Sequence, residues 1–312
     1  MTGLGIDVGG TYTKWVTLDG DAVSGSGTVP TPPGPEETVR LVASLAPHAD
    51  SIGIGLPGHV DRDTGTALFV PNPPGDWDGF PVGARLRALT GAPVAVVNDA
   101  RAFALAELEL GAARGLSDVL FAVLGTGVGG AVALRGAVLV GPRDNLGEVG
   151  HVTVSPWGPA CCCGNRGCAE TFAAGPAIVR AFGSGATKVT GAAVTGPGPS
   201  AAGIAGARAI AAQVTAAEVA DAARAGDERA AQAFEQAGWA LGVALGDAAA
   251  FFGAPSVVVG GGIAGALDLM RSTLHTELAR RRPLIGEITV LPAVLGPMAG
   301  AIGAALYGRR SG

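Results

Sequence analysis

Two short glycine-rich turns, far apart in the sequence, constrain the fold more than any other feature. The first is DVGGT, from Asp7 to Thr11, and the second is GTGVGG, from Gly125 to Gly130. Each turn follows a short apolar run and leads into another run of alternating apolar residues, which predicts strand, turn and strand. The repetition predicts a duplicated α/β architecture with a ligand bound between the two halves.

Strand and helix patterns alternate along the rest of the chain. We expect strands at 3–8, 13–18 and 22–28, and helices at 36–46, 81–90, 215–225, 228–252 and 266–281. The runs SIGIGLPG, APVAVVND, PSVVVGGG and ITVLPAV predict buried strands. Asp99 is expected to open the helix ARAFALAELELGAA, Asp227 to cap helix 228–252, and a last helix to follow Pro297. The segment 183–206, poor in bulky side chains, predicts a mobile loop.

Length and composition indicate a folded protein without a basic surface. A chain of 312 residues with 48% hydrophobic content supplies a substantial core. The net charge of −5 gives no basic footprint, so we expect neither nucleic acid nor a membrane surface as a partner. The sequence has neither a long uninterrupted apolar run nor a signal-peptide pattern, and we expect a cytoplasmic protein.

All the cysteines fall within one short stretch, at Cys161, Cys162, Cys163 and Cys168. The cytosol keeps thiols reduced and three of these residues are adjacent, so a metal site is favoured over disulfides. Three thiolates and one imidazole form the closed tetrahedral set of structural zinc. We therefore expect one structural Zn²⁺ held by His151, Cys161, Cys163 and Cys168, with four free thiols as the alternative. Cys162 is expected not to be a ligand, although an exchange of roles with Cys161 stays open.

Three glycine turns, at 7–11, 125–130 and 260–262, each follow an apolar strand. Such turns let backbone N–H groups approach an anion closely, which predicts phosphate binding when several occur together. The GxxxxGK[ST] pattern is absent and GTGVGG leads into a strand, so the P-loop and the dinucleotide-binding motif both fit poorly.

The motifs DVGGT, NDARAFALAE, LGTGVGG, GEVGH, the cysteine cluster and VVVGGG, in this order and spacing, resemble the ROK family of sugar kinases and related repressors. The resemblance spans nearly the whole chain and implies an α/β, actin/hexokinase-like pair of ribonuclease H-like domains closing over sugar and nucleotide. It implies a smaller domain at 1–115 with a helix at about 298–312, and a larger domain at 116–297 with the zinc-binding loop 151–168. Because IDVGGT begins at residue 6, we expect the kinase branch rather than the repressors, which carry an N-terminal DNA-binding domain.

The resemblance also implies the residues of a sugar site. Asp99 would be the general base on the sugar hydroxyl and Asn98 would bond a neighbouring hydroxyl. The alternative is that Asn98 and Asp99 only cap the following helix. Glu148 and His151 are three residues apart, which places them on one face of a helical turn. The remaining sugar contacts implied by the resemblance are Gly58, Glu148, His151 and Glu170.

A nucleotide site follows from the same resemblance. Asp7 matches the family's aspartate that organises Mg²⁺ through water. Lys14 departs from the commonest pattern, because the chain reads GGTYTK where many members read GGTK. Lys14 would contact phosphate or, alternatively, be a solvent-facing strand residue. The turn residues that would cradle phosphate are Gly9, Gly10, Thr11, Gly125, Thr126, Gly127, Gly260, Gly261 and Gly262.

The motif set favours an ATP- and Mg²⁺-dependent kinase that phosphorylates the primary 6-hydroxyl of a glucose-like hexose, with glucokinase as the simplest match. The unusual residues Tyr12, Trp15 and the loop from Asn72 to Trp77 keep kinases for N-acetylmannosamine, allose, fructose, an amino sugar or a cyclitol open. Polyphosphate is a less favoured donor, since similar enzymes of that kind generally lack the cysteine cluster. Other classes are a non-catalytic sugar sensor and a structural zinc module for protein association. A homodimer is implied by the resemblance alone.

Overall fold

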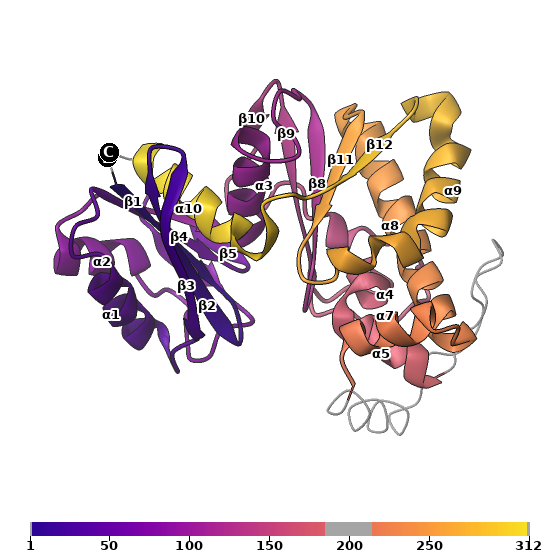
Figure 1. Cartoon of the computed structure of the whole chain (residues 1–312), viewed down its shortest axis with the longest axis horizontal. Coiled ribbons are helices and arrows are strands. Elements are labelled where there is room, and N and C mark those ends of the chain that lie inside the picture. Colours follow the sequence, from indigo (N-terminus) through magenta and orange to yellow (C-terminus); the bar gives the residue numbers. More distant parts are fainter. Residues whose placement is uncertain (1, 185–213, 311–312) are drawn as a thin grey trace. The chain divides into compact units, whose positions relative to one another are not determined.

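The computed structural model describes residues 2–184 and 214–310. These residues form two five-stranded sheets, a two-stranded sheet and the helices around them (Figure 1). The α/β class expected from the sequence is therefore confirmed. The segment 183–206, expected to be a mobile loop, lies outside the described residues except for Gly183 and Ser184, which end a helix.

The first sheet is built from a meander of three strands followed by two parallel additions. Its strands are β1 (Thr2–Val8), β2 (Tyr12–Asp19), β3 (Ala22–Pro30), β4 (Ser51–Leu56) and β7 (Val94–Asn98). They lie in the order β3-β2-β1-β4-β7. The pairs β1–β2 and β2–β3 are antiparallel, whereas β4 is parallel to both β1 and β7. The strands expected at 3–8, 13–18 and 22–28 are confirmed, and the DVGGT turn joins β1 to β2.

The second sheet repeats this plan. Its strands are β8 (Val119–Leu124), β9 (Val128–Leu134), β10 (Ala137–Val138), β11 (Ser256–Gly260) and β12 (Thr289–Pro292). They lie in the order β10-β9-β8-β11-β12, with β11 parallel to both β8 and β12. The GTGVGG motif joins β8 to β9 and leads into a strand, as its sequence predicts. The duplication is therefore visible in the strand order of both sheets.

Helices and short elements occupy the connections between strands. The helices are α1 (Pro35–Leu45), α2 (Val82–Thr90), α3 (Asp99–Glu109), α4 (Glu170–Ala173), α5 (Gly175–Ser184), α7 (Ala216–Arg224), α8 (Glu228–Phe252), α9 (Leu267–Ile285) and α10 (Ala299–Arg310). The short elements are β5 (His59–Asp61), β6 (Thr66–Phe69), η1 (Val149–His151), η2 (Ala264–Ala266) and η3 (Gly296–Met298).

Two helices test the sequence signals directly. The Asp227 side chain accepts hydrogen bonds from the N–H groups of Arg229 and Ala230, which confirms it as the cap of α8. Helix α9 ends at Ile285 rather than at the expected residue 281. Pro283 lies in the last turn of α9, where the missing N–H removes only one helical hydrogen bond, so the helix continues past it.

The chain divides into two compact units. Of the described residues, unit 1 comprises those within 1–117, 131–146 and 293–312, and unit 2 comprises those within 118–130 and 147–292. In unit 1, α1 and α2 pack on one face of the first sheet, and their core includes Leu4, Ile6, Val39, Ile54 and Leu86. Helix α10 packs against β1 and β4 on the opposite face of this sheet (Figure 1). Each strand can serve both faces because its successive side chains point to opposite sides.

Unit 2 has a helical layer of its own. The helices α8 and α9 pack side by side (Figure 1), and α4, α5 and α7 also pack against α8 or one another. Phe172 of α4 packs edge-on against Trp239 of α8, with ring centroids 5.8 Å apart. Among the described residues, no helix combines the length and the apolar character that a membrane crossing requires.

Candidate functional site

The predicted site residues of unit 1 gather where parallel strands of the first sheet end. In the strand register, Asp7 on β1 lies beside Gly55 on β4, and Leu56 on β4 lies beside Asn98 on β7. Asp7 and Asn98 therefore lie at the same edge of the sheet, separated by one strand. The carboxyl ends of parallel strands are where α/β sheets present ligand-binding groups.

Asn98 caps helix α3, and Asp99 is the first helical residue, so the helix opens one residue earlier than expected. The Oδ1 atom of Asn98 accepts hydrogen bonds from the N–H groups of Ala100 and Arg101 at 2.9 and 3.2 Å. Asn98 has the extended backbone that a cap requires. Asn98 is buried, whereas Asp99 is half-buried and keeps part of its surface open to solvent.

Gly58 holds Asn98 from the neighbouring connection. Its carbonyl accepts a hydrogen bond from Nδ2 of Asn98 at 2.8 Å. The residue has a φ of +91°, and a Cβ atom there would lie 2.0 Å from the carbonyl oxygen of Phe69. Only glycine fits this position without displacing backbone.

Asp7 and Lys14 face each other across the β1–β2 hairpin. They are register partners, and Nζ of Lys14 lies 3.8 Å from Oδ2 of Asp7. Burial raises the pKa of the Asp7 carboxyl, and the nearby charge of Lys14 opposes that rise. The Lys14 side chain keeps 32% of its surface exposed, so it is neither buried nor a fully solvent-facing strand residue.

The first glycine turn is braced from the end of β3. The Thr31 hydroxyl donates to the carbonyl of Gly9 at 2.7 Å, and the Thr31 N–H donates to the carbonyl of Thr11 at 2.9 Å. Gly10 and Thr11 are exposed at the tip of the turn. The turn is thus fixed by carbonyl contacts on its inner side, while its tip faces outward.

In unit 2, Glu170 sits against the second glycine turn. Its Oε2 atom accepts a hydrogen bond from the N–H of Val128 at 3.0 Å. A Cβ atom on Gly127 would lie 2.6 Å from that same oxygen, so glycine lets the carboxylate approach the backbone. Thr126, at the tip of this turn, is exposed.

The two glycine turns of unit 2 lie side by side. The N–H of Ile263 donates to the carbonyl of Leu124 at 3.1 Å, which brings the turn at 260–262 next to the turn that begins at Gly125. Gly125 also accepts a hydrogen bond from the N–H of Gly175 at 2.9 Å, where α5 begins. Two of the three predicted phosphate-binding turns therefore form one surface in unit 2.

Glu148 and His151 bracket the 3₁₀ turn η1. The N–H of His151 donates to the carbonyl of Glu148 at 3.0 Å. Glu148 is the N-cap of η1 and His151 is its last residue, so both ends of the GEVGH motif lie in one turn. The predicted site residues thus form two groups, one within each unit.

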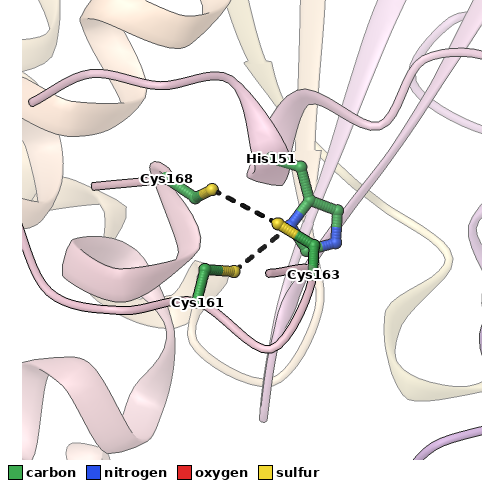
Figure 2. A group of neighbouring side chains, drawn as sticks. All are labelled: His151, Cys161, Cys163 and Cys168. Carbon is green, nitrogen blue, oxygen red and sulfur yellow. Dashed lines mark hydrogen bonds between the residues drawn. The ribbon is translucent and has the colours of Figure 1, made fainter. Parts of the chain in front are cut away.

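The four predicted zinc ligands converge (Figure 2). Each of His151, Cys161, Cys163 and Cys168 offers one atom, and these atoms all lie within 4.8 Å of one another. The Sγ atoms of Cys163 and Cys168 are 3.6 Å apart, and Sγ of Cys161 is 3.5 Å from Nδ1 of His151. A tetrahedral zinc ion with bonds of about 2.0–2.3 Å separates its ligand atoms by roughly 3.3–3.8 Å, so the set fits this ion.

Cys162 lies outside this group of four. It is exposed, and its Sγ atom is 3.5 Å from Oε1 of Glu170. Cys161, Cys162 and Glu170 form a second, smaller group of possible ligand atoms. Burial raises the pKa of the Cys161 and Cys168 thiols, so both stay protonated until a cation displaces the proton.

Two polar residues of unit 1 were not predicted from the sequence. Arg101 is fully buried, and Asp144 is only 1% exposed. Their side chains form an ion pair, with Nε of Arg101 4.0 Å from Oδ1 of Asp144. One sequence feature could have indicated the pair: Arg101 lies within the apolar run of NDARAFALAE. An arginine buried with that run would require a partner of opposite charge. Nothing in the sequence pointed to Asp144, which lies 43 residues further along.

Comparison with known proteins adds an independent finding. The sequence model of the ROK family matches residues 3–310. The chain belongs to the ROK family. A glucokinase from Thermotoga maritima is 34% identical over 281 residues, covering 87% of this chain and 85% of the relative. An N-acetylmannosamine kinase from Escherichia fergusonii is 32% identical over 313 residues, covering 98% of each chain.

The fold of this chain is similar to that of a solved ROK structure. The crystal structure of a ROK family glucokinase from Streptomyces griseus in complex with glucose and AMPPNP is 32% identical, with a TM-score of 0.79 over 99% of this chain and 100% of that chain. The actin/hexokinase-like fold expected from the ROK resemblance is therefore confirmed.

Proposed function

We propose that this ROK protein transfers the γ-phosphoryl group of ATP to the primary 6-hydroxyl of a glucose-like hexose. The observation that carries the proposal is the half-buried carboxylate of Asp99, placed at the carboxyl end of β7 directly after the fixed amide of Asn98. Glucokinases are among the relatives with about one third of their residues identical to this chain. ATP is a cytoplasmic metabolite, and the proposed reaction takes place in that compartment.

In unit 1, Asp99 accepts the proton of the attacking hydroxyl while Asn98 binds a neighbouring hydroxyl. Phosphoryl transfer depends mainly on positioning and on neutralising phosphate charge. Asp7 would hold Mg²⁺ through water, and the ion would supply charge neutralisation at the phosphate oxygens. The exposed tip of the turn from Gly9 to Thr11 offers backbone N–H groups to phosphate, and the ammonium group of Lys14 lies 3.8 Å from the Asp7 carboxylate.

In unit 2, Glu148, His151 and Glu170 bind sugar hydroxyls, and the turns at 125–127 and 260–262 bind nucleotide phosphate. His151, Cys161, Cys163 and Cys168 would hold one Zn²⁺, which would supply a rigid tie between η1 and the cysteine loop. Because Nδ1 of His151 faces the sulfur atoms, Nε2 is the ring nitrogen left for a sugar hydroxyl.

N-acetylmannosamine is the second candidate substrate. The Escherichia fergusonii kinase for this sugar matches 98% of this chain, whereas the Thermotoga maritima glucokinase matches 87%. The two relatives differ by only two percentage points in identity, so identity alone does not rank the substrates. A bulkier substituent on the sugar would have to fit beside the same hydroxyl-binding groups.

The test is a coupled assay of hexoses, N-acetylmannosamine, amino sugars and cyclitols, each with ATP and with polyphosphate. We expect the highest kcat/KM for glucose with ATP. Asp99→Asn should lower kcat by about 10²–10⁴-fold and leave sugar affinity nearly unchanged. Asp63→Asn, at an exposed turn of unit 1, is the matched control and should leave kcat unchanged.

Two outcomes would reject the proposal or parts of it. Absence of turnover on every sugar, combined with no ATP binding in calorimetry, would favour a sugar sensor. Full activity of Asp99→Asn would remove the general-base role. Sedimentation of the purified chain tests the proposed homodimer separately.

A further inference from the structure

The side-chain amide of Asn98 makes more hydrogen bonds than a helix cap requires. Its Oδ1 atom accepts the two backbone N–H groups of the cap and, in addition, a hydrogen bond from Nη1 of Arg101 at 2.8 Å. Its Nδ2 atom donates one hydrogen to the carbonyl of Gly58 at 2.8 Å. Within the described residues, the oxygen and one N–H of this amide therefore have hydrogen-bond partners. The second N–H of Nδ2 is the donor that remains.

Arg101 reinforces the orientation of this amide, which the two cap N–H groups and the Gly58 carbonyl already favour. Asparagine oxygen and nitrogen have nearly the same shape, so a cap alone is compatible with several local rearrangements of the side chain. If the amide were flipped, so that its nitrogen took the place of its oxygen, the NH₂ group would face three hydrogen-bond donors. Two of these donors are backbone N–H groups and the third is the guanidinium of Arg101. Removal of the guanidinium weakens this restriction, while the two cap hydrogen bonds remain.

Asp144 and the loop around it hold Arg101 in place. Besides the ion pair with Asp144, the guanidinium donates from Nη2 to the carbonyl of Leu146 at 2.6 Å. Asp144 also accepts a hydrogen bond from the backbone N–H of Asn98 at 2.7 Å, through Oδ2. The two buried charges thus fix both the backbone and the side chain of Asn98.

We propose that Arg101 and Asp144 are positioning residues for sugar recognition, which fix Asn98 as a hydrogen-bond donor to one oxygen of the sugar. The inference rests on the proposed function, because it assigns the direction of a hydrogen bond within that same site. A site that presents only a donor selects a sugar oxygen able to accept at that position, and it loses affinity for an analogue without that oxygen.

The experiment compares glucose with a panel of monodeoxy glucose analogues in the wild-type protein, Arg101→Met and Arg85→Met. Arg85 pairs with Glu36 on the exposed side of unit 1 and serves as the matched control. For Arg101→Met we expect the KM for glucose to rise by about tenfold or more, with a smaller change in kcat. For one deoxy analogue, wild type and Arg101→Met should have the same KM, because the hydroxyl that Asn98 serves is missing.

A purely structural role of Arg101 predicts a different pattern. The KM values for glucose and for every deoxy analogue would then rise by the same factor, and that result would overturn the proposal. The KM for ATP should stay at its wild-type value in Arg101→Met. No turnover of any sugar by the wild-type protein would overturn the proposed function and this inference together, whereas wild-type turnover with a uniform rise in Arg101→Met overturns the inference alone.

Two further variants keep the test decisive if Arg101→Met fails to fold. The double variant Arg101→Gln/Asp144→Asn removes both buried charges, and asparagine tolerates the φ of +50° at position 144. It should show the same selective rise in KM for glucose. Asn98→Asp keeps the cap oxygen but removes both amide N–H groups, so it should abolish the discrimination between glucose and that one deoxy analogue. Unchanged discrimination in a folded Asn98→Asp variant would overturn the donor assignment.

Discussion

The corner between β7 and α3 in unit 1 and the loop from His151 to Glu170 in unit 2 present the two groups of site residues in different ways. The corner is made of a strand, a capped helix and a buried ion pair, so each group is held by other protein groups. The loop contains little regular structure: outside its terminal turns, the bridges Thr153 to Cys168 and Ala160 to Arg166 are its β-type pairings among the described residues. Its four ligand atoms nonetheless converge.

This difference indicates two routes to a preorganised site. At the corner, the free energy that fixes Asn98 comes from folding itself, because cap, ion pair and strand form together. In the loop, desolvation raises the pKa of the Cys161 and Cys168 thiols, which hold their protons and offer only weak hydrogen bonds. An ion that binds three thiolates and one imidazole would supply the missing stabilisation.

The largest expected effect comes from removing a ligand of the loop. Cys168→Ser should lower the zinc content from about one per chain to near zero and lower kcat/KM by about 10–100-fold or more. Cys168 is fully buried, so the loss also exposes the loop to proteolysis. Metal analysis by mass spectrometry and limited proteolysis measure both effects. A wild-type protein purified without any zinc would contradict the premise.

A change at the other end of α3 tests the claim that unit 1 relies on protein groups alone. The buried Glu107 carboxylate accepts hydrogen bonds from the N–H groups of Ala112, Val294 and Leu295. Glu107→Ala leaves these donors without that acceptor and should lower the free energy of unfolding by about 2–4 kcal/mol, with the zinc content unchanged. Glu107→Gln keeps one acceptor oxygen and should cost less. Urea unfolding provides the measurement, and equal stability of wild type and Glu107→Ala would refute the assignment.

Asp7 gives a smaller effect with a defined pH dependence. Burial raises its folded-state pKa above the ordinary value of 3.8, so the folded state binds this proton more tightly than the unfolded state does. The stabilisation from the protonated carboxyl is fully present below pH 3.8 and is lost as the pH rises through the raised folded-state pKa. Asp7→Asn should therefore raise the Tm slightly near neutral pH, and less in acid, while turnover falls.

Thermal melts across this pH range provide the check, with Lys14→Met as the opposing variant. Loss of the Lys14 charge removes the group that opposes the pKa rise, so Lys14→Met should lower the Tm near neutral pH. A Tm difference between Asp7→Asn and wild type that does not change with pH would contradict the explanation by burial.

The smallest effect is expected at Cys162, within the loop but outside its group of four. Its thiol lies 3.5 Å from Oε1 of Glu170, and a serine hydroxyl retains a donor at that position. Cys162→Ser should keep the zinc content and change kcat/KM by less than about twofold. Loss of zinc in this variant would show that Cys162 replaces one of the four proposed ligands.

The sequence predicted the features that depend on local pattern. Alternation and glycine turns predicted the strands of both sheets, and the spacing of His151 and the cysteines predicted a group that the structure brings together. The cap of α3 was predicted one residue late, because Asn98 and Asp99 are both good cap residues and only the backbone distinguishes them.

Long-range polar contacts could not be predicted from sequence patterns. Arg101 and Asp144 are charged residues of types that are usually exposed, and their burial depends on how a loop folds back onto α3. Similarly, Glu107 was visible as the end of NDARAFALAE, but its backbone partners at 294 and 295 lie almost at the other end of the chain. Such contacts follow from the tertiary fold and produce no periodic pattern in the sequence.

The near absence of regular structure between η1 and α4 has a consequence for how the protein matures in a cell. The β7–α3 corner of unit 1 is held by protein groups, so we expect a newly made molecule to acquire it whatever the supply of trace metals. In our proposal the loop from His151 to Glu170 must also capture a zinc ion, and it would compete for that ion with every other thiol-rich protein. A culture starved of zinc would therefore accumulate chains that are folded by most spectroscopic criteria yet inactive, and zinc added after purification would restore them without refolding.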